Sequence, residues 1–171
     1  MGETMADSND LQAATVLGEL GRCDVTHIVW LPDSETGYMY EAMRASQFTL
    51  VPVCREGESM AIAAGLIMGG KRPVVLIQST GLYESGDSVR GLGLDLQLPL
   101  LLMIGYRGFP GRGRPPADSA ARFLEPILDA WGIPHYLVDS GDACHHISEA
   151  YRQAHATTHP VAVLMGREYN G

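Results

Sequence analysis

The stretch that decides the fold is residues 51–80, which read VPVCREGESMAIAAGLIMGGKRPVVLIQST. Residues 56–68 are rich in Ala and Met and end at two glycines, a pattern typical of a helix and its C-cap. The continuous apolar run at 73–78 is typical of a central parallel strand that is covered on both faces. Because almost no charge follows Glu58 in the helix, we expect the helix to be buried on most sides.

The same alternation of strand and helix extends in both directions from this stretch. Strands are predicted at residues 25–31, 48–53, 73–78, 98–106, 134–139 and 160–166, and helices at 11–20, 34–45, 56–68, 119–131 and 142–156. Residues 87–96 are also predicted to form a helix, although Gly91 and Gly93 within this segment disfavour one. Asp7, Ser8 and Asn9 are predicted to cap the first helix. The pattern predicts an α/β, doubly wound, six-stranded and mostly parallel sheet with helices on both faces. In such folds ligands bind outside the carboxyl ends of the strands.

The composition predicts one domain that spans residues 1–171. The hydrophobic fraction of 46% is enough for a core, and a net charge of −8 without a basic run argues against nucleic acid or an anionic membrane surface as a partner. Cys23, Cys54 and Cys144 form no CxxC pair, which argues against a disulfide scaffold and favours a reducing cytosol. The acidic first ten residues and the lack of a long apolar run predict a cytoplasmic protein without a membrane segment.

Several common site motifs are weak or missing. Residues 65–72 resemble a phosphate-binding P-loop as far as Lys71, but Arg72 replaces the hydroxyl residue and the segment follows a predicted helix instead of a strand. A helix C-cap explains this segment better, and an autonomous nucleotide-binding protein is a distant alternative. His145 and His146 have no ligand spacing around them that indicates a metal site, so none is predicted in this chain.

Glu56 is the most informative acid in the sequence. It stands where a strand ends and an otherwise apolar helix begins, in VPVCREGESMAIAAG. The helix dipole favours a carboxylate in the first turn, so an ordinary first-turn glutamate is one explanation. The order of the segments around Glu56 offers another.

Residues 54–82, CREGESMAIAAGLIMGGKRPVVLIQSTGL, are preceded by LPDS and followed at 98–111 by LPLLLMIGYRGFPG. In this order they resemble the pyrimidine-binding domain of thiamine-diphosphate-dependent decarboxylases. More narrowly, they resemble the α subunit of sulfopyruvate decarboxylase and the matching part of phosphonopyruvate decarboxylase. The motifs are Glu56-Gly57, Ala-Ala-Gly at 63–65, Gln-Ser-x-Gly-Leu at 78–82 and Arg-Gly at 107–108.

The resemblance implies a role for Glu56 in catalysis. In this family the motif glutamate contacts a ring nitrogen of the aminopyrimidine and favours the imino tautomer, which removes the proton of the thiazolium carbon. A 2-oxo acid with a second anionic group is the implied substrate class, and decarboxylation is the implied reaction. The cofactor carries the difficult chemistry, while the protein orients and tunes it.

The resemblance implies further site residues, each with a simpler alternative. Gln78, Ser79, Thr80 and Gly81 would line the pyrimidine, or would form only a turn after a strand. Asp33 in Pro-Asp-Ser would face the substrate, or would cap the next helix through an Asx turn. Arg107 would bind the acidic group of the substrate with its guanidinium, or would be a solvated loop arginine.

One family motif is missing from this chain. The family holds the diphosphate and its Mg²⁺ with Gly-Asp-Gly and a downstream Asn, whereas the Gly-Asp pairs here continue as Gly86-Asp87-Ser88 and Gly141-Asp142-Ala143. The resemblance therefore implies a second subunit that carries the diphosphate-binding domain. The enzyme would be a hetero-oligomer with at least two copies of each chain, and its active site would lie between them.

Other departures leave the substrate open. The family usually has Gly-Asn where this chain has Tyr83-Glu84, and the loop segment 113–117 contains no histidine. A carboligase subunit and a non-catalytic regulatory or scaffold subunit are the alternatives.

Overall fold

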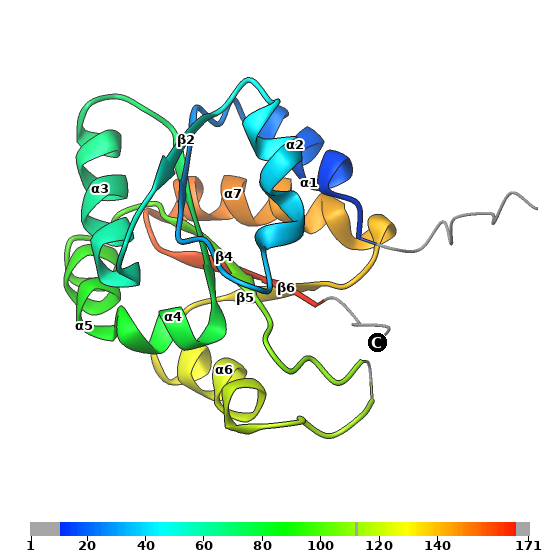
Figure 1. The fold of residues 1–171 in the computed structure, drawn as a ribbon. Helices are drawn as coiled ribbons and strands as arrows, with labels where there is room; N and C mark the ends of the chain where they lie inside the picture. Colours follow the sequence, from blue (N-terminus) through cyan, green and yellow to red (C-terminus); the bar gives the residue numbers. More distant parts are fainter. Residues whose placement is uncertain (1–10, 112, 167–171) are drawn as a thin grey trace, which may run out of the picture.

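Six strands form a single sheet in the computed structural model, which describes residues 11–111 and 113–166 (Figure 1). The strands are β1 (His27–Trp30), β2 (Thr49–Pro52), β3 (Pro73–Gln78), β4 (Leu101–Gly105), β5 (His135–Val138) and β6 (Val161–Met165), in the order β2-β1-β3-β4-β6-β5. Every pair is parallel, with His27 opposite both Thr49 and Pro73. All carboxyl ends therefore lie along one edge of the sheet.

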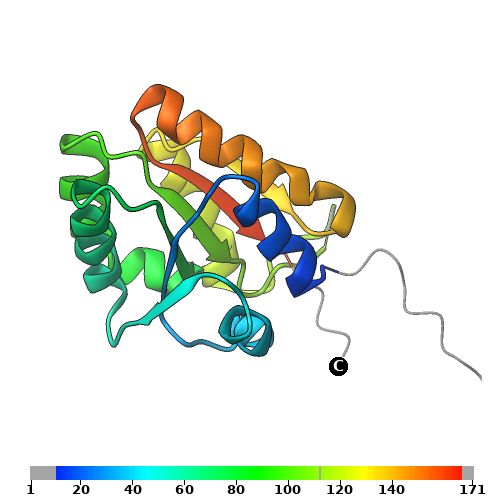
Figure 2. The same cartoon turned by 90° about the horizontal axis from the view of Figure 1, so that it is seen from above.

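Helices cover both faces of the sheet. One face carries α1 (Ala13–Gly21), η1 (Gly37–Met39), α2 (Tyr40–Arg44), η3 (Gly141–Cys144) and α7 (His145–Thr157). The other face carries α3 (Glu56–Met68), α4 (Ser79–Glu84), α5 (Gly86–Ser88), the π-helical turn η2 (Val89–Asp95) and α6 (Ser119–Ala130). Seen from above, α7 lies along β6 (Figure 2). The doubly wound α/β architecture that the sequence predicts is confirmed.

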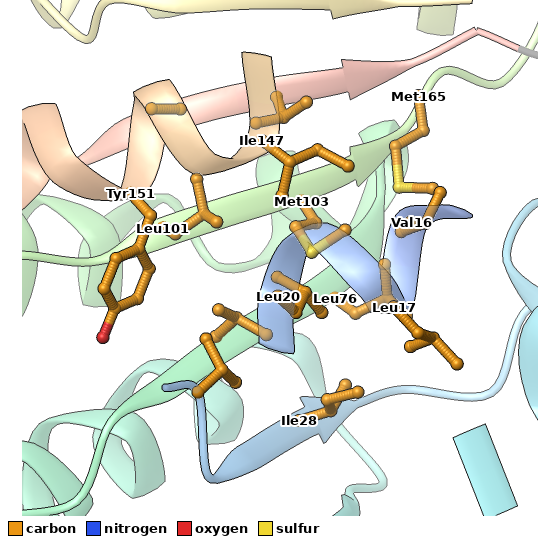
Figure 3. Close-up of a cluster of buried hydrophobic side chains, with 14 of the residues drawn as sticks. Val16, Leu17, Leu20, Ile28, Leu76, Leu101, Met103, Ile147, Tyr151 and Met165 are labelled. Carbon is orange, nitrogen blue, oxygen red and sulfur yellow. The ribbon is translucent and has the colours of Figure 1, made fainter. Parts of the chain in front are cut away.

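The alternation of side chains along each strand divides the core into two clusters. Ile28 faces α1 and α7, while the next residue, Val29, faces α3 and α6. Figure 3 shows the first cluster, in which Leu101 and Met103 of β4 pack against side chains of α1 and α7. The strands β3, β4 and β6 are covered on both faces and are apolar except for Gln78 at the end of β3.

The observed boundaries agree best with prediction in the stretch that decides the fold, where α3 and β3 have the predicted bounds. The predicted helix at 34–45 begins later, as a 3-10 turn at Gly37. The helix α4, over residues 79–84, was not predicted, and the predicted helix at 87–96 is divided between α5 and η2. The proposed caps at 7–9 lie outside the described residues.

The prediction that the α3 helix is buried on most sides is wrong for this chain. Its buried residues are Ser59, Met60, Ala63 and Ala64, which lie on the face toward the sheet. Ala61, Gly65 and Met68 are exposed on the opposite face, with Met68 at 86%. Within the described residues, no helix combines the length and the apolar character needed to cross a bilayer.

The strand order creates a topological switch point. From β1 the chain passes to the edge strand β2, whereas β3 lies on the other side of β1 and leads toward β4. The loops that leave β1 and β3 therefore diverge, which opens a crevice at the carboxyl edge of the sheet.

Candidate active site

Three loops at the switch point carry most of the residues that the sequence analysis singled out. Asp33 follows β1, Glu56 follows β2, and residues 78–81 end β3 and begin α4. Because β2, β1 and β3 are adjacent, these segments leave the sheet at the same edge.

Glu56 is the first residue of α3 and is half-buried against α4. Arg55 before it is in an extended conformation, so the chain turns sharply from the strand into the helix at this point. A Cβ atom placed on Gly81 would lie 2.5 Å from Cγ of Glu56 and 2.8 Å from its Oε1. Any side chain at position 81 would therefore displace the glutamate. The structure thus brings Glu56 into contact with the 78–81 segment, which is 22 or more residues away along the chain.

Buried polar atoms without partners lie on two of these segments, after β1 and at the end of β3. Oε1 of Gln78, Oγ of Ser79 and Oδ2 of Asp33 are buried and lack a hydrogen-bond partner among the described residues. Buried polar groups nearly always find a partner, so such atoms require an explanation. A ligand or another chain bound at the switch point would supply partners for these atoms.

Asp33 shows both of the features considered for it. Its Oδ1 accepts hydrogen bonds of 2.8 Å from the backbone N–H groups of Glu35 and Thr36, which is the predicted capping turn. Its Oδ2 is the unpartnered atom described above. Burial outweighs these hydrogen bonds and raises the pKa of Asp33 above the ordinary value of an aspartate.

A largely apolar hollow of about 870 Å³ adjoins Asp33. It is lined by Trp30, Pro32, Asp33, Ser34, Gly37, Tyr40, Leu50 and Pro52. The rings of Trp30 and Tyr40 stack at 5.6 Å, and Nε1 of Trp30 donates to Oγ1 of Thr36 at 2.8 Å. These contacts fix the shape of the hollow on the β1 side.

Two acidic residues near the site were missed by the sequence analysis or left without a role. Glu35 lies over the end of β4, since a Cβ on Gly105 would be 2.7 Å from its Cβ. Glu84, from the last position of α4, contacts the start of α3: its Oε2 accepts from the N–H of Gly57 at 2.8 Å, and its Oε1 accepts from Nε of Arg55 at 3.0 Å. These bonds hold the pKa of Glu84 below the ordinary value. Only its departure from the Gly-Asn of the family marked Glu84 in the sequence.

The remaining predicted residues are less closely placed. Thr80 is half-buried on α4, next to the contact between Glu56 and Gly81. Arg107 is exposed on the loop after β4, and no contact joins it to Glu56, Asp33 or the 78–81 segment within the described residues.

Outside the switch point, the first turn of α7 gathers His145, His146 and Glu149, whose possible ligand atoms lie within 4.8 Å of one another. Nδ1 of His145 is 2.7 Å from the carbonyl of Asp142, and Nδ1 of His146 is 2.9 Å from Oε2 of Glu149. All three residues belong to α7, which follows β5 at the far edge of the sheet from the switch point, and we assign no metal to this group.

The sequence is similar to that of a curated archaeal protein. It is 30% identical over 120 residues to the sulfopyruvate decarboxylase subunit alpha of Methanocaldococcus jannaschii, and the match covers 70% of this chain and 71% of that one. The chain belongs to the sulfopyruvate decarboxylase α-subunit family.

Other relatives agree with membership of this α-subunit family. The subunit alpha of Methanothermobacter thermautotrophicus is 31% identical over 120 residues, which cover 70% of this chain and 73% of that one. The phosphonopyruvate decarboxylase of Streptomyces viridochromogenes is 26% identical over 143 residues, which cover 82% of this chain and 36% of that one. No protein-family model matches the chain.

Solved structures support the fold assigned to this family member. Benzoylformate decarboxylase from Polynucleobacter necessarius superposes with a TM-score of 0.74 at 20% identity, over 89% of this chain and 29% of that one. A 2-oxoglutarate:ferredoxin oxidoreductase from Magnetococcus marinus gives a TM-score of 0.64 at 19% identity, over 92% of this chain and 29% of that one. The chain thus has the fold of one part of much longer chains.

Proposed function

We propose that this chain is the aminopyrimidine-binding subunit of a thiamine-diphosphate-dependent 2-oxo acid decarboxylase. The observation that carries the proposal is the carboxylate of Glu56, held against Gly81 at the switch point beside the unpartnered atoms of Gln78 and Ser79. The names of the relatives, which are decarboxylases or their α subunits, support the reaction class. Residues 1–171 would act as one pyrimidine-binding domain.

The residues at the switch point fit one half of the cofactor. Glu56 would share a proton with a ring nitrogen of the aminopyrimidine, and Gly81 would keep the carboxylate in place by leaving no room for it to move toward α4. Gln78 and Ser79 would supply hydrogen-bonding atoms to the same ring. Asp33 would face the substrate, where its raised pKa favours holding a proton. When bound, thiamine diphosphate supplies the electron sink for decarboxylation.

The other half of the cofactor needs groups that this sequence does not offer in the family's form. Gly86-Asp87 lies in α5 and Gly141-Asp142 in η3, and neither pair is followed by glycine. A second subunit would therefore hold the diphosphate and Mg²⁺. The assembly would be a cytoplasmic hetero-oligomer with at least two copies of each chain, which agrees with the free thiols of Cys23, Cys54 and Cys144.

The outer face of α3 gives this second subunit a place to bind. Ala61, Gly65 and Met68 are exposed there, and Leu96, just after the adjacent η2, is 62% exposed. An apolar face of this kind usually marks an interaction surface. Because α3 begins at Glu56, a chain that covers this face would reach the half-site that the cofactor must share.

The substrate would be a small 2-oxo acid with a second anionic group, such as a sulfonate or phosphonate. Arg107 is exposed on a loop at the carboxyl edge, and its guanidinium would fork onto such a group. The names of the relatives include both sulfopyruvate and phosphonopyruvate decarboxylases, so either acid is a suitable first assay substrate.

The test is Glu56→Gln in the complex of both subunits with thiamine diphosphate, Mg²⁺ and sulfopyruvate or phosphonopyruvate. Glutamine keeps the packing on Gly81 but cannot share the proton, so we expect release of carbon dioxide to fall at least about 100-fold with the fold intact. Glu41→Gln, at the first turn of α2, is the matched control and should keep full activity. Near-normal activity of Glu56→Gln would refute the proposal, and product analysis would reveal a carboligase.

A further inference from the structure

We propose that Glu84 is a positioning residue for Glu56. This inference rests on the proposed function, because it assigns Glu84 the task of holding the carboxylate that would act on the cofactor. The sequence singled out Glu84 only as a departure from the family pattern, and neither the motifs nor the relatives assign it a role.

Glu84 binds both neighbours of Glu56 in the chain. The N–H of Gly57 donates to Oε2 of Glu84 at 2.8 Å, and Nε of Arg55 donates to Oε1 at 3.0 Å. Nη2 of Arg55 also donates to Oε1, at 2.5 Å. One carboxylate from α4 thus holds the backbone directly after Glu56 and the side chain of the residue before it.

The hydrogen bond from Gly57 to Glu84 takes the place of a helix cap, which the local sequence does not provide. The first N–H groups of a helix have no acceptor within it, and Arg55 at the N-cap position makes no side-chain capping bond. Glu84 supplies a charged acceptor for one of these groups from 27 residues away. A Cβ on Gly57 would lie 3.2 Å from Oγ of Ser88 and 3.5 Å from Oε2 of Glu84, so α3 begins in close contact with the 84–88 segment.

The same short helix, α4, holds Glu56 from a second direction. Gly81 forms the surface against which the Glu56 side chain packs, and Glu84 lies three residues further along. Gly81 therefore limits the side chain while Glu84 limits the backbone. Neither contact alone would fix both the position and the direction of the carboxylate.

Charge gives Glu84 a second effect on the site. Arg55 lies near the carboxylates of Glu56, Glu58 and Glu84, and its hydrogen bonds go to Glu84. Asp87 lines a second hollow, separate from the one beside Asp33, together with Arg55 and Glu84. With Glu84 removed, Arg55 would be left with the other carboxylates around it, and pairing with Glu56 would draw that acid away from the cofactor. Glu84 therefore also keeps Arg55 away from Glu56.

Stability alone does not explain this arrangement. The side chains of Arg55 and Glu84 are 78% and 32% exposed, and exposed ion pairs contribute little to folding. The hydrogen bond from the Gly57 N–H to Glu84 is what distinguishes a positioning role from a surface ion pair. The experiment therefore follows the Gly57 N–H group directly.

The experiment compares Glu84→Ala and Glu84→Gln with the unaltered chain. In the full chain, NMR follows hydrogen exchange at the Gly57 amide, where we expect about ten-fold faster exchange in Glu84→Ala and partial protection in Glu84→Gln. In the assembled enzyme, kcat in Glu84→Ala should fall about ten-fold or more while KM for the 2-oxo acid changes less than about two-fold. Glu41→Gln is again the control.

A further variant separates the two effects of Glu84. Arg55→Ala combined with Glu84→Ala should regain part of the lost kcat, because no guanidinium then competes for Glu56. Unchanged kcat and unchanged Gly57 exchange in Glu84→Ala, with Glu56→Gln inactive, would overturn this inference alone. An active Glu56→Gln would instead refute the proposed function. Hydrogen exchange at the Gly57 amide would still show whether Glu84 protects that N–H group.

Discussion

At the scale of single residues, the site is defined by close contacts that restrict which side chains fit and how they are oriented. Gly81 touches Glu56 so closely that no larger residue fits, and Asp33 uses one carboxylate oxygen for a turn while the other has no partner among the described residues. Such atoms weaken a fold in proportion to their burial and remain where a ligand needs them.

Asp33 gives a prediction that separates stability from function. Because burial raises its pKa, the charged form is disfavoured in the folded chain, and folding loses stability as the pH rises through this pKa. Asp33→Asn keeps the Oδ1 acceptor and removes the charge. We therefore expect a higher melting temperature at pH 7, by about 2–4 °C for each kcal/mol gained, together with lower activity of the complex.

Calorimetry against pH checks this prediction. The difference between Asp33→Asn and the unaltered chain should shrink as the pH falls and vanish below the ordinary pKa of aspartate, where both states carry a neutral side chain. A variant that is less stable at every pH would show that the carboxylate has a partner outside the described residues.

Sequence reasoning reaches part of this residue-scale description. Glu56 was found because it begins an apolar helix directly after a strand, and the family motif drew attention to residues 78–81. Glu35 and Glu84 act across loops and between helices, through contacts with Gly105 and Gly57 that no local pattern encodes. The residues that Glu35 and Glu84 contact depend on the order of the strands in the sheet. The hydrophobic periodicity of the sequence does not specify that order.

At the scale of elements, α3 and β3 were predicted to the residue because each has a strong pattern and clear end signals. The helix α4 was missed, since its six residues include a glycine and no N-cap side chain. Tertiary contacts stabilise it instead: Leu82 is fully buried, and the Tyr83 hydroxyl donates to the carbonyl of Ala120 in α6 at 2.6 Å.

Tyr83→Phe tests how much this bond between α4 and α6 contributes. Loss of the hydroxyl leaves the Ala120 carbonyl without this donor, so we expect a loss of about 1 kcal/mol in the free energy of unfolding at pH 7. Tyr40→Phe is the control, since the hydroxyl of Tyr40 forms no hydrogen bond within the described residues. Chemical denaturation measures both, and equal stability of the two variants would contradict the prediction.

The pH dependence of Tyr83 gives an independent check. Burial raises the pKa of Tyr83 to about 12, so the folded state resists the ionisation that the unfolded state undergoes near the ordinary tyrosine pKa of 10.0. Stability of the unaltered chain is therefore lost as the pH rises above 10.0, and the advantage over Tyr83→Phe should narrow there.

At the scale of the whole molecule, the doubly wound sheet follows from six apolar strands that alternate with helices. The extent to which α3 is buried could not be predicted from the sequence. An apolar pattern shows that a helix is covered, but not whether its own chain or another one covers it. The exposed Met68 and Leu96 make the second case the better explanation.

Met68→Lys and Leu96→Lys test this surface. A lysine at either site places a charge in the apolar contact, so we expect binding of the second subunit to weaken about ten-fold or more while the lone chain keeps its melting temperature. Phe123→Lys, at an exposed apolar residue of α6, is the control. Calorimetric titration with the second subunit measures the affinity, and unchanged binding by both variants would place the interface elsewhere.

The position of β2 at the edge of the sheet has a consequence for regulation. This strand has one neighbour and no fully buried residue, and it leads directly into Arg55 and Glu56. An edge strand with few buried residues opens more easily than a central one, so thermal opening of β2 would loosen Glu56 before the core unfolds. A neighbouring chain that braces this edge would suppress the opening. Assembly would then fix the orientation of the Glu56 carboxylate. A subunit that dissociates would lose activity while it stays folded.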